Sequence, residues 1–175
     1  MRFEVGCDPQ SKEFKEYWSR NGYSQESKGF NHNKLLEMLV DVVKENFSQL
    51  IVWRENGKIV GHAVWHESNV EEHRKGGYPR DEEAREALEK LLGKKKDFVE
   101  LHEWWLIEKY RGKNYGNEFL DFFEAHMKSK GYTDLVFYAD HPAALAAFRK
   151  RGYIEGGYLA ESREYVFCHS LEESH

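Results

Sequence analysis

The sequence has few of the residues that mark disulfide-rich or multidomain proteins. Its 175 residues include two cysteines, Cys7 and Cys168, and three prolines. One possible cysteine pair is too few for the disulfide framework of a small secreted domain. No Ser/Gly-rich linker and no low-complexity stretch divides the chain, so nothing marks a second domain. We therefore predict one domain over residues 1–175, in a reducing compartment.

Long apolar runs are missing as well. The longest, Ala143–Phe148, is far shorter than the roughly 20 residues of a membrane-spanning helix. The first residues, Met1–Gly6, include an acid and lack the apolar core of a signal peptide. The sequence therefore predicts a soluble, cytoplasmic protein that does not contact a membrane.

Neither sign of charge dominates the chain. The 26 Lys and Arg residues stand against 31 Asp and Glu residues, for a net charge of -5. A nucleic-acid-binding face needs an excess of basic residues to neutralise phosphates. We therefore predict no nucleic-acid partner.

The nine histidines raise the question of a metal site, but their spacing argues against one. His62 and His66 fall on one predicted strand, where four residues span about 13 Å. Two ligands of one ion would each lie only about 2 Å from it. No predicted helix carries a His-x-x-x-His pattern, and no cysteines are paired in sequence. We predict that the chain binds no metal.

Strand and helix patterns follow one another along the chain. The strands are predicted over Arg2–Val5, Gln49–Arg54, Lys58–His66, Phe98–Ile107, Thr133–Ala139, Tyr153–Leu159 and Glu164–His169. Helices are predicted over Pro9–Ser19, Asn33–Asn46, from Gly116 to a glycine cap at Gly131, and over Pro142–Lys150. This order predicts a mixed α/β domain without regular alternation.

A charged stretch, residues 68–96, separates the third strand from the fourth. It contains the breakers Gly76-Gly77-Tyr78-Pro79 and a predicted helix that begins near Asp81 and ends at Gly93. We interpret this stretch as an addition at the surface. The alternative is a lid over an acceptor site.

The fourth strand runs into a loop of small and basic residues that opens directly into a helix. Gly112 and Gly116 allow close backbone approach, and Arg111 and Lys113 add positive charge. Free N–H groups at such a helix start bind phosphate. The alternative is an ordinary strand-to-helix turn. The loop is not a P-loop, because no Gly-Lys-Ser/Thr follows at the required spacing.

Two motifs in this half of the chain resemble the GNAT superfamily of acyl-CoA-dependent N-acetyltransferases. Arg111 and Gly116 match the ends of the family's Gln/Arg-x-x-Gly-x-Gly/Ala motif. Ala144 and Gly152 match its second motif, Asn-x-x-Ala-x-x-x-Tyr-x-x-x-Gly-Phe, with Tyr153 in place of Phe. The resemblance spans about residues 98–153, and the element order of the whole chain also fits.

Three residues depart from the family's pattern. Asn114 replaces the first motif glycine, and Asn tolerates a left-handed backbone. His141 replaces the usual Asn, and either residue could cap the helix or hydrogen-bond the cofactor. Phe148 replaces the Tyr that often protonates the departing thiolate. Water, Tyr138 or Tyr153 would then supply that proton, or protonation would fall outside the slow step.

The resemblance implies a three-layer fold. Its central, mostly antiparallel sheet is splayed between the fourth and fifth strands, with helices on both faces. Acetyl-CoA would lie in the gap between the strands that end at Ile107 and Ala139, and a backbone N–H near Leu106 would polarise its thioester carbonyl. The residues implied in cofactor binding are Trp105, Leu106, Ile107, Arg111, Gly112, Lys113, Asn114, Tyr115, Gly116, Asn117, His141, Ala144 and Phe148.

The implied reaction is direct attack of an amine on the thioester in a ternary complex. An ammonium acceptor must first lose a proton, often through water to a carboxylate. The fourth strand offers Glu100, His102 and Glu103. Glu100 lies eleven residues before Arg111, where some family members keep a glutamate base, and is the first choice, with Glu103 second. Trp104 is a candidate wall of the acceptor site.

Three functions remain open at this point. The first is an N-acetyltransferase that uses acetyl-CoA and no metal, acting on a small-molecule amine or a protein amino group. The second is a non-catalytic acyl-CoA-binding module, because of Phe148 and Asn114. The third is a nucleotide- or phosphate-binding regulatory domain. An exposed edge strand near the C-terminus makes a homodimer possible.

Overall fold

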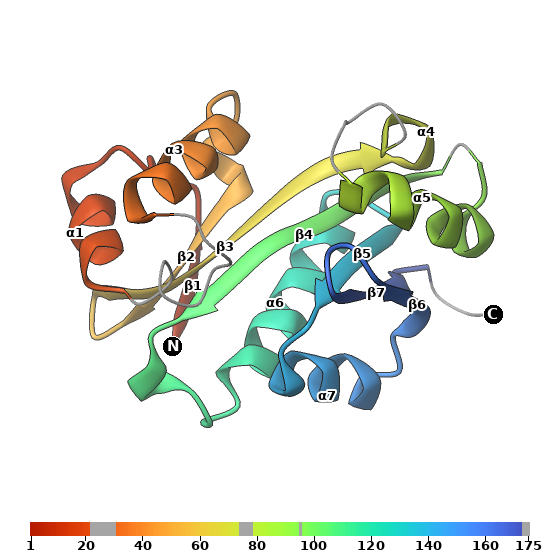
Figure 1. Ribbon diagram of the computed structural model, residues 1–175. Helices are drawn as coiled ribbons and strands as arrows, with labels where there is room; N and C mark the ends of the chain where they lie inside the picture. The colour runs from red at the N-terminus through yellow and green to blue at the C-terminus, as the bar shows by residue number, and fades with distance from the viewer. Residues whose placement is uncertain (22–30, 74–78, 95, 173–175) are drawn as a thin grey trace. The chain divides into compact units, whose positions relative to one another are not determined.

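The computed structural model describes residues 1–21, 31–73, 79–94 and 96–172. Within them, seven strands form a sheet in the order β1-β2-β3-β4-β5-β7-β6 (Figure 1). The strands are β1 Arg2–Val5, β2 Leu50–Glu55, β3 Lys58–Asn69, β4 Asp97–Leu106, β5 Asp134–Ala139, β6 Ile154–Leu159 and β7 Glu164–Ser170. Strands β4 and β5 pair parallel, whereas β1–β2, β2–β3, β5–β7 and β6–β7 pair antiparallel. The predicted mixed α/β class and mostly antiparallel sheet are confirmed.

The helices follow the predicted order. They are α1 Lys12–Arg20, α3 His32–Val43, α4 Val70–His73, α5 Pro79–Leu92, α6 Tyr115–Ser129 and α7 Pro142–Lys150, with 3-10 turns η1 Phe47–Gln49 and η2 Glu108–Tyr110. Helix α1 begins three residues after the predicted Pro9, because the hydroxyl of Ser11 accepts a hydrogen bond from the N–H of Phe14 and caps it there. None of the helices in the described ranges is both long and apolar enough to cross a bilayer.

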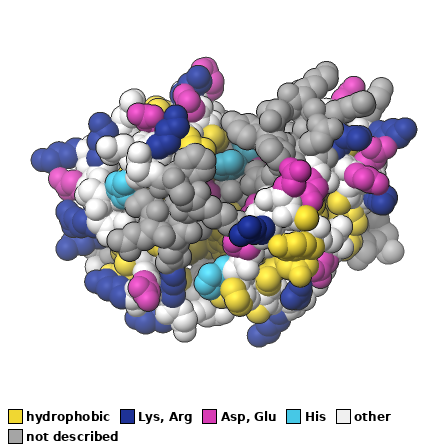
Figure 2. All heavy atoms as spheres, viewed as in Figure 1, with side chains coloured by type: hydrophobic (Ala, Val, Ile, Leu, Met, Phe, Trp, Pro, Cys, Tyr) yellow, Lys and Arg dark blue, Asp and Glu magenta, His cyan; other side chains and the backbone are white. Residues whose placement is uncertain are grey.

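The chain forms two compact units. The N-terminal unit comprises Met1–His66 and His102–Tyr115, and the C-terminal unit comprises Glu67–Leu101 and Gly116–His175. The single domain expected from the composition stays a prediction. On the face drawn in Figure 2, Lys and Arg side chains lie among Asp and Glu side chains, as the near balance of charge leads one to expect.

In the N-terminal unit, α1 and α3 pack their apolar faces on the β2–β3 hairpin. Phe14, Trp18 and Leu39 from the helices and Val52 and Val64 from the strands are buried in one cluster. The hairpin turns at Asn56 and Gly57, both with positive φ, as the Asn-Gly pair predicts. This packing fixes which residues of β3 face the helices.

The C-terminal unit has a core on each face of its strands. On one face, Phe123 of α6 and Phe148 of α7 pack their rings against Phe137 of β5. On the other, Ala84 and Leu88 of α5 are fully buried in a cluster with residues of β5, β6 and β7. Helices therefore cover both faces, as expected.

The interpretation of residues 68–96 as a surface addition is wrong. Ala84 and Leu88 have no exposed surface, and Val70 of α4 joins the same cluster. Residues 74–78, which include Gly76, Gly77 and Tyr78, lie outside the described residues, as does the side chain of Asp81. The inserted helix is part of the core because it supplies the apolar surface that covers this face of β5 and β7.

Gly61 in β3 determines how closely the end of β4 can approach β3. A Cβ atom at Gly61 would lie 2.7 Å from the carbonyl oxygen of Trp105 and 3.2 Å from side-chain atoms of Leu106 and Trp53. A backbone oxygen cannot move aside as a side-chain tip can. The position of the β4 end in the N-terminal unit therefore requires glycine at this place in β3.

We expect Gly61→Ala to lower the free energy of unfolding by about 1–3 kcal/mol, the usual cost of overpacking. Gly156→Ala is the matched control, since a Cβ there meets Leu91 Cδ1, the end of a flexible side chain, at 2.8 Å and Val166 Cγ1 at 3.0 Å, while the backbone oxygen of Val166 lies 3.5 Å away. Urea unfolding of both variants measures the difference. An equal loss in the two variants would contradict the role given to the Trp105 carbonyl.

Candidate active site

The loop after β4 is folded back onto the end of its own strand. The N–H of Ile107 donates to the carbonyl of Val60 (2.9 Å), and Nε of Arg111 donates to the carbonyl of Leu106 (2.8 Å). The Arg111 guanidinium also lies 4.2 Å from the centre of the Trp105 ring, within cation–π range. The backbone of Trp105–Ile107 was expected to pair with a cofactor. Two of its groups, the Ile107 N–H and the Leu106 carbonyl, instead make hydrogen bonds within the N-terminal unit.

The loop turns through two left-handed residues directly into α6. Gly112 has φ 78° and Asn114 has φ 68°, and α6 begins at Tyr115. The expectation that Asn114 takes the left-handed backbone of the missing glycine is confirmed. The N–H groups of the first helical turn, at Tyr115, Gly116 and Asn117, lie at the positive end of the helix dipole. The local geometry is that of an anion site.

One face of β4 carries Glu100, His102 and Trp104. Glu100 is 1% exposed, and the ring of Trp104 lies 6.4 Å from that of Trp53. The rings of His102 and His66 have their centres 5.5 Å apart. Imidazoles are common zinc ligands, and these two lie close together. The expectation that the chain binds no metal therefore stays a prediction.

On the other face of β4, Glu103 ends a chain of three hydrogen-bonded side chains. Its Oε2 lies 3.2 Å from Nε2 of His62, and Nδ1 of the same ring lies 2.8 Å from the hydroxyl of Tyr17. His62 is fully buried and Tyr17 is 5% exposed. The sequence had suggested only a possible metal-ligand role for His62, and these hydrogen bonds were not predicted. The signal was the alternation of β3, which puts His62 on the same face as Val60 and Val64.

The predicted residues of the second motif lie in the C-terminal unit. His141 caps α7, with its Nδ1 accepting the N–H of Ala143 at 3.2 Å. Ala144 is half-buried in the first turn, whereas Phe148 has no exposed surface and its ring centre lies 5.3 Å from that of Phe167. The capping role of His141, one of its two expected roles, is thus observed. Phe148 contacts core rings in this structure.

The two tyrosines considered as proton donors are also buried. Tyr138 is 8% exposed and Tyr153 is 5% exposed. Burial, with a smaller contribution from the charge of Glu124, raises the pKa of Tyr153 above its usual range. Its hydroxyl accepts a hydrogen bond from Nε of Arg151 (3.1 Å).

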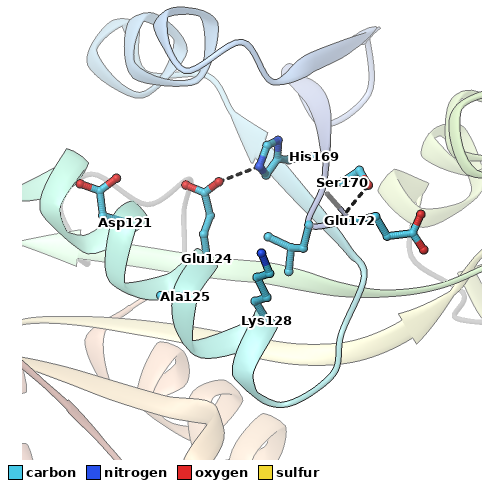
Figure 3. Close-up of a pocket in the computed structure, with 8 residues that line it drawn as sticks. Asp121, Glu124, Ala125, Lys128, His169, Ser170 and Glu172 are labelled. Atoms are coloured by element: carbon cyan, nitrogen blue, oxygen red, sulfur yellow. Dashed lines mark hydrogen bonds and ion pairs between the residues drawn. The ribbon is translucent and has the colours of Figure 1, made fainter. Parts of the chain in front are cut away.

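A surface pocket of the C-terminal unit contains none of the predicted site residues. It is lined by α6 and by the end of β7 (Figure 3), through Asp121, Glu124, Ala125, Lys128, His169, Ser170, Leu171 and Glu172. Glu124 Oε1 lies 2.6 Å from Nε2 of His169, and Glu124 also pairs with Arg151. Burial of this carboxylate opposes its ionisation, but the His169 and Arg151 contacts outweigh it and lower the pKa of Glu124 below its usual range.

Comparison with known families agrees with these features. The model of the acetyltransferase (GNAT) family matches residues 10–153, which is most of the chain. The chain belongs to the GNAT family. The resemblance drawn from Arg111, Gly116, Ala144 and Gly152 is confirmed, and so is its assignment to the acetyltransferases. A search of curated proteins found no match.

Solved GNAT structures share this fold at low sequence identity. Polyamine N-acetyltransferase of Drosophila melanogaster superposes with a TM-score of 0.71 at 13% identity, over 97% of this chain and 99% of that one. Arylalkylamine N-acetyltransferase 2 of Aedes aegypti gives 0.68 at 15% identity, over 98% and 99%. The Bacillus subtilis N-acetyltransferase YlbP, solved with coenzyme A, gives 0.58 at 14% identity, over 97% and 95%. At these identities the likeness shows the fold.

The ionised state of Glu124 should contribute to stability at neutral pH. Because its pKa is lowered on folding, this contribution is present above the unfolded-state pKa of about 4.3 and is lost as pH falls through the folded-state pKa. Glu124→Gln should therefore lower the unfolding free energy at pH 7 and flatten its dependence on pH between about 5 and 3. Asp121→Asn is the control, since the Asp121 side chain is 73% exposed and pairs with the same Arg151. Equal effects of the two substitutions in urea titrations would contradict the assignment.

Proposed function

We propose that this GNAT protein transfers the acetyl group of acetyl-CoA to a primary amine of a small molecule, by direct attack in a ternary complex. The observation that carries the proposal is the left-handed turn at Gly112 and Asn114 that leads directly into α6. Such a turn aims backbone N–H groups at one point, where a pyrophosphate is bound well. Arg111 and Lys113 add positive charge beside it.

A small cationic acceptor is supported by the side chains of β4. Glu103 is a carboxylate with 13% of its side chain exposed, and a carboxylate favours a cationic acceptor. The structures that share this fold include enzymes named for polyamine, agmatine and arylalkylamine acetylation. An amine of one of these classes is therefore the proposed acceptor.

Acetyl-CoA would supply an acyl group activated as a thioester. Around it, the loop from Arg111 to Asn117 would hold the pyrophosphate and a backbone N–H near Leu106 would stabilise the developing oxyanion. Phe148 has no hydroxyl and no exposed surface. We therefore assign protonation of the departing thiolate to water.

The choice between the two candidate bases depends on access. Glu100 is 1% exposed, whereas the side chain of Glu103 is 13% exposed. An ammonium group needs contact with the base directly or through one water. We therefore propose Glu103 as the base and reverse the order of preference drawn from the sequence.

Binding of the cofactor should be visible in thermal unfolding. At about 100 times its dissociation constant, acetyl-CoA or CoA should add about 2.7 kcal/mol and raise the midpoint by roughly 5–10 °C, while ATP should add much less. Asn114→Gly should keep this shift, since glycine adopts positive φ freely. Asn114→Val should lose most of it, because a β-branched residue is strained there. A shift by ATP equal to that by CoA would favour a nucleotide-binding domain and contradict the proposal.

Acetyl transfer should be detected as CoA released in the presence of amines. We expect turnover with agmatine, spermidine or tryptamine and much less with a lysine-containing peptide. Glu103→Gln should lower kcat by about 10²- to 10⁴-fold, the usual contribution of a general base, and Glu100→Gln by less. Cofactor-induced thermal shifts without turnover on any amine would instead favour the non-catalytic binding module.

A further inference from the structure

Three elements of the N-terminal unit contribute one polar side chain each to a continuous chain of hydrogen bonds. Tyr17 comes from α1, His62 from β3 and Glu103 from β4, with separations of 2.8 Å and 3.2 Å. His62 has no exposed surface and Tyr17 is 5% exposed, whereas 13% of the Glu103 side chain is exposed. The chain therefore begins in the core and ends at its most exposed member, Glu103.

The direction of the hydrogen bonds follows from the chemistry of the groups. Burial, opposed by a hydrogen bond with Asn21 and aided by the charge of Glu103, raises the pKa of Tyr17 well above its usual range, so its hydroxyl keeps a proton that it can donate to Nδ1 of His62. An ionised carboxylate only accepts. With Glu103 ionised, the Nε2–H tautomer of His62 lets Nε2 donate to Glu103 while Nδ1 accepts from Tyr17.

The His62 ring is held in place by the side chains around it. Its centre lies 6.1 Å from the ring of Phe14, 5.8 Å from that of Tyr17 and 5.4 Å from that of Trp18, all on α1. Apolar residues fill the rest of this core, including Leu39 and Val64. Replacing a whole buried polar network in such a core by apolar residues is often neutral or stabilising, although removing one member alone is destabilising. A stability role therefore gives little reason for an imidazole here.

We propose that His62, itself held by Tyr17, is a positioning residue that keeps Glu103 ionised and directed as the base for the acceptor amine. This inference rests on the proposed N-acetyltransfer. Glu103 takes one proton from the ammonium group, and the freed nitrogen lone pair forms the N–C bond. The C–S bond breaks with its electron pair on sulfur. The surplus proton on nitrogen is lost to water, the thiolate takes a proton from water, and Glu103 returns its proton to solvent when the products leave.

The test is the pH profile of kcat/KM for an amine that the wild type acetylates. Without the Nε2 donor, the ionised form of Glu103 loses a charge-assisted hydrogen bond. We therefore expect His62→Leu to move the acidic limb upward by about one to two pH units and to lower kcat about tenfold or more, with KM for acetyl-CoA unchanged. His62→Gln supplies an amide N–H in place of the imidazole donor. Its acidic limb should therefore lie closer to that of the wild type. Tyr17→Phe keeps an aromatic ring at position 17 but removes the hydroxyl that fixes the tautomer of His62. We therefore expect its acidic limb to lie between those of the wild type and His62→Leu.

Two measurements separate this role from a merely structural one. Urea unfolding checks that each variant folds, and Tyr158→Phe, at a tyrosine that is 54% exposed in the C-terminal unit, is the control expected to leave the profile unchanged. Nitrogen-15 spectra of the histidines at neutral pH should show His62 as the neutral Nε2–H tautomer, whether or not an amine substrate is known.

The outcomes distinguish the inference from the proposed function. An active enzyme whose acidic limb is the same in wild type and in a folded His62→Leu variant overturns the positioning role alone, as does an Nδ1–H tautomer of His62. A wild type that binds acetyl-CoA but acetylates no amine overturns the proposed function, and the catalytic role of Glu103 with it.

Discussion

The close approach of two backbones at Gly61 is the constraint on which the candidate site depends. Because β3 has no side chain there, the Trp105 carbonyl lies against it, and the N–H of Ile107 reaches the carbonyl of Val60 at 2.9 Å. This contact holds the end of β4 just before the loop. Arg111 then returns to the Leu106 carbonyl and the Trp105 ring. The loop at the start of α6 thus begins from a fixed strand end.

Strand β4 pairs with β5 over only part of its length. Its pairing with β5 covers three positions, from Val99↔Leu135 to Leu101↔Phe137, although β4 continues to Leu106. The paired part belongs to the C-terminal unit, and the part from His102 onward belongs to the N-terminal unit. The candidate site residues of β4, from Glu100 to Leu106, lie in the part that belongs to the N-terminal unit and next to its boundary.

The two faces of β4 place its carboxylates in different surroundings. Glu100 is almost completely buried, while Glu103 is partly exposed and joined to a buried imidazole. The same residue type, three positions apart, thus lies in two environments because side chains alternate along a strand. The base proposed here must be reachable by an acceptor, and Glu103 retains 13% of its side-chain surface whereas Glu100 retains almost none.

The sequence by itself determined the order of the elements, the mixed α/β class, the strand–loop–helix arrangement and the left-handed backbone at Asn114. These follow from short-range signals: apolar periodicity, caps, and residues that tolerate positive φ. Only the tertiary structure decided that α5 lies in the core, that Phe148 is enclosed by rings, and that Tyr17, His62 and Glu103 meet. Tyr17 and His62 are 45 residues apart, and His62 and Glu103 are 41 apart. Contacts over such separations depend on how α1, β3 and β4 pack together, and no local pattern of residues specifies that packing.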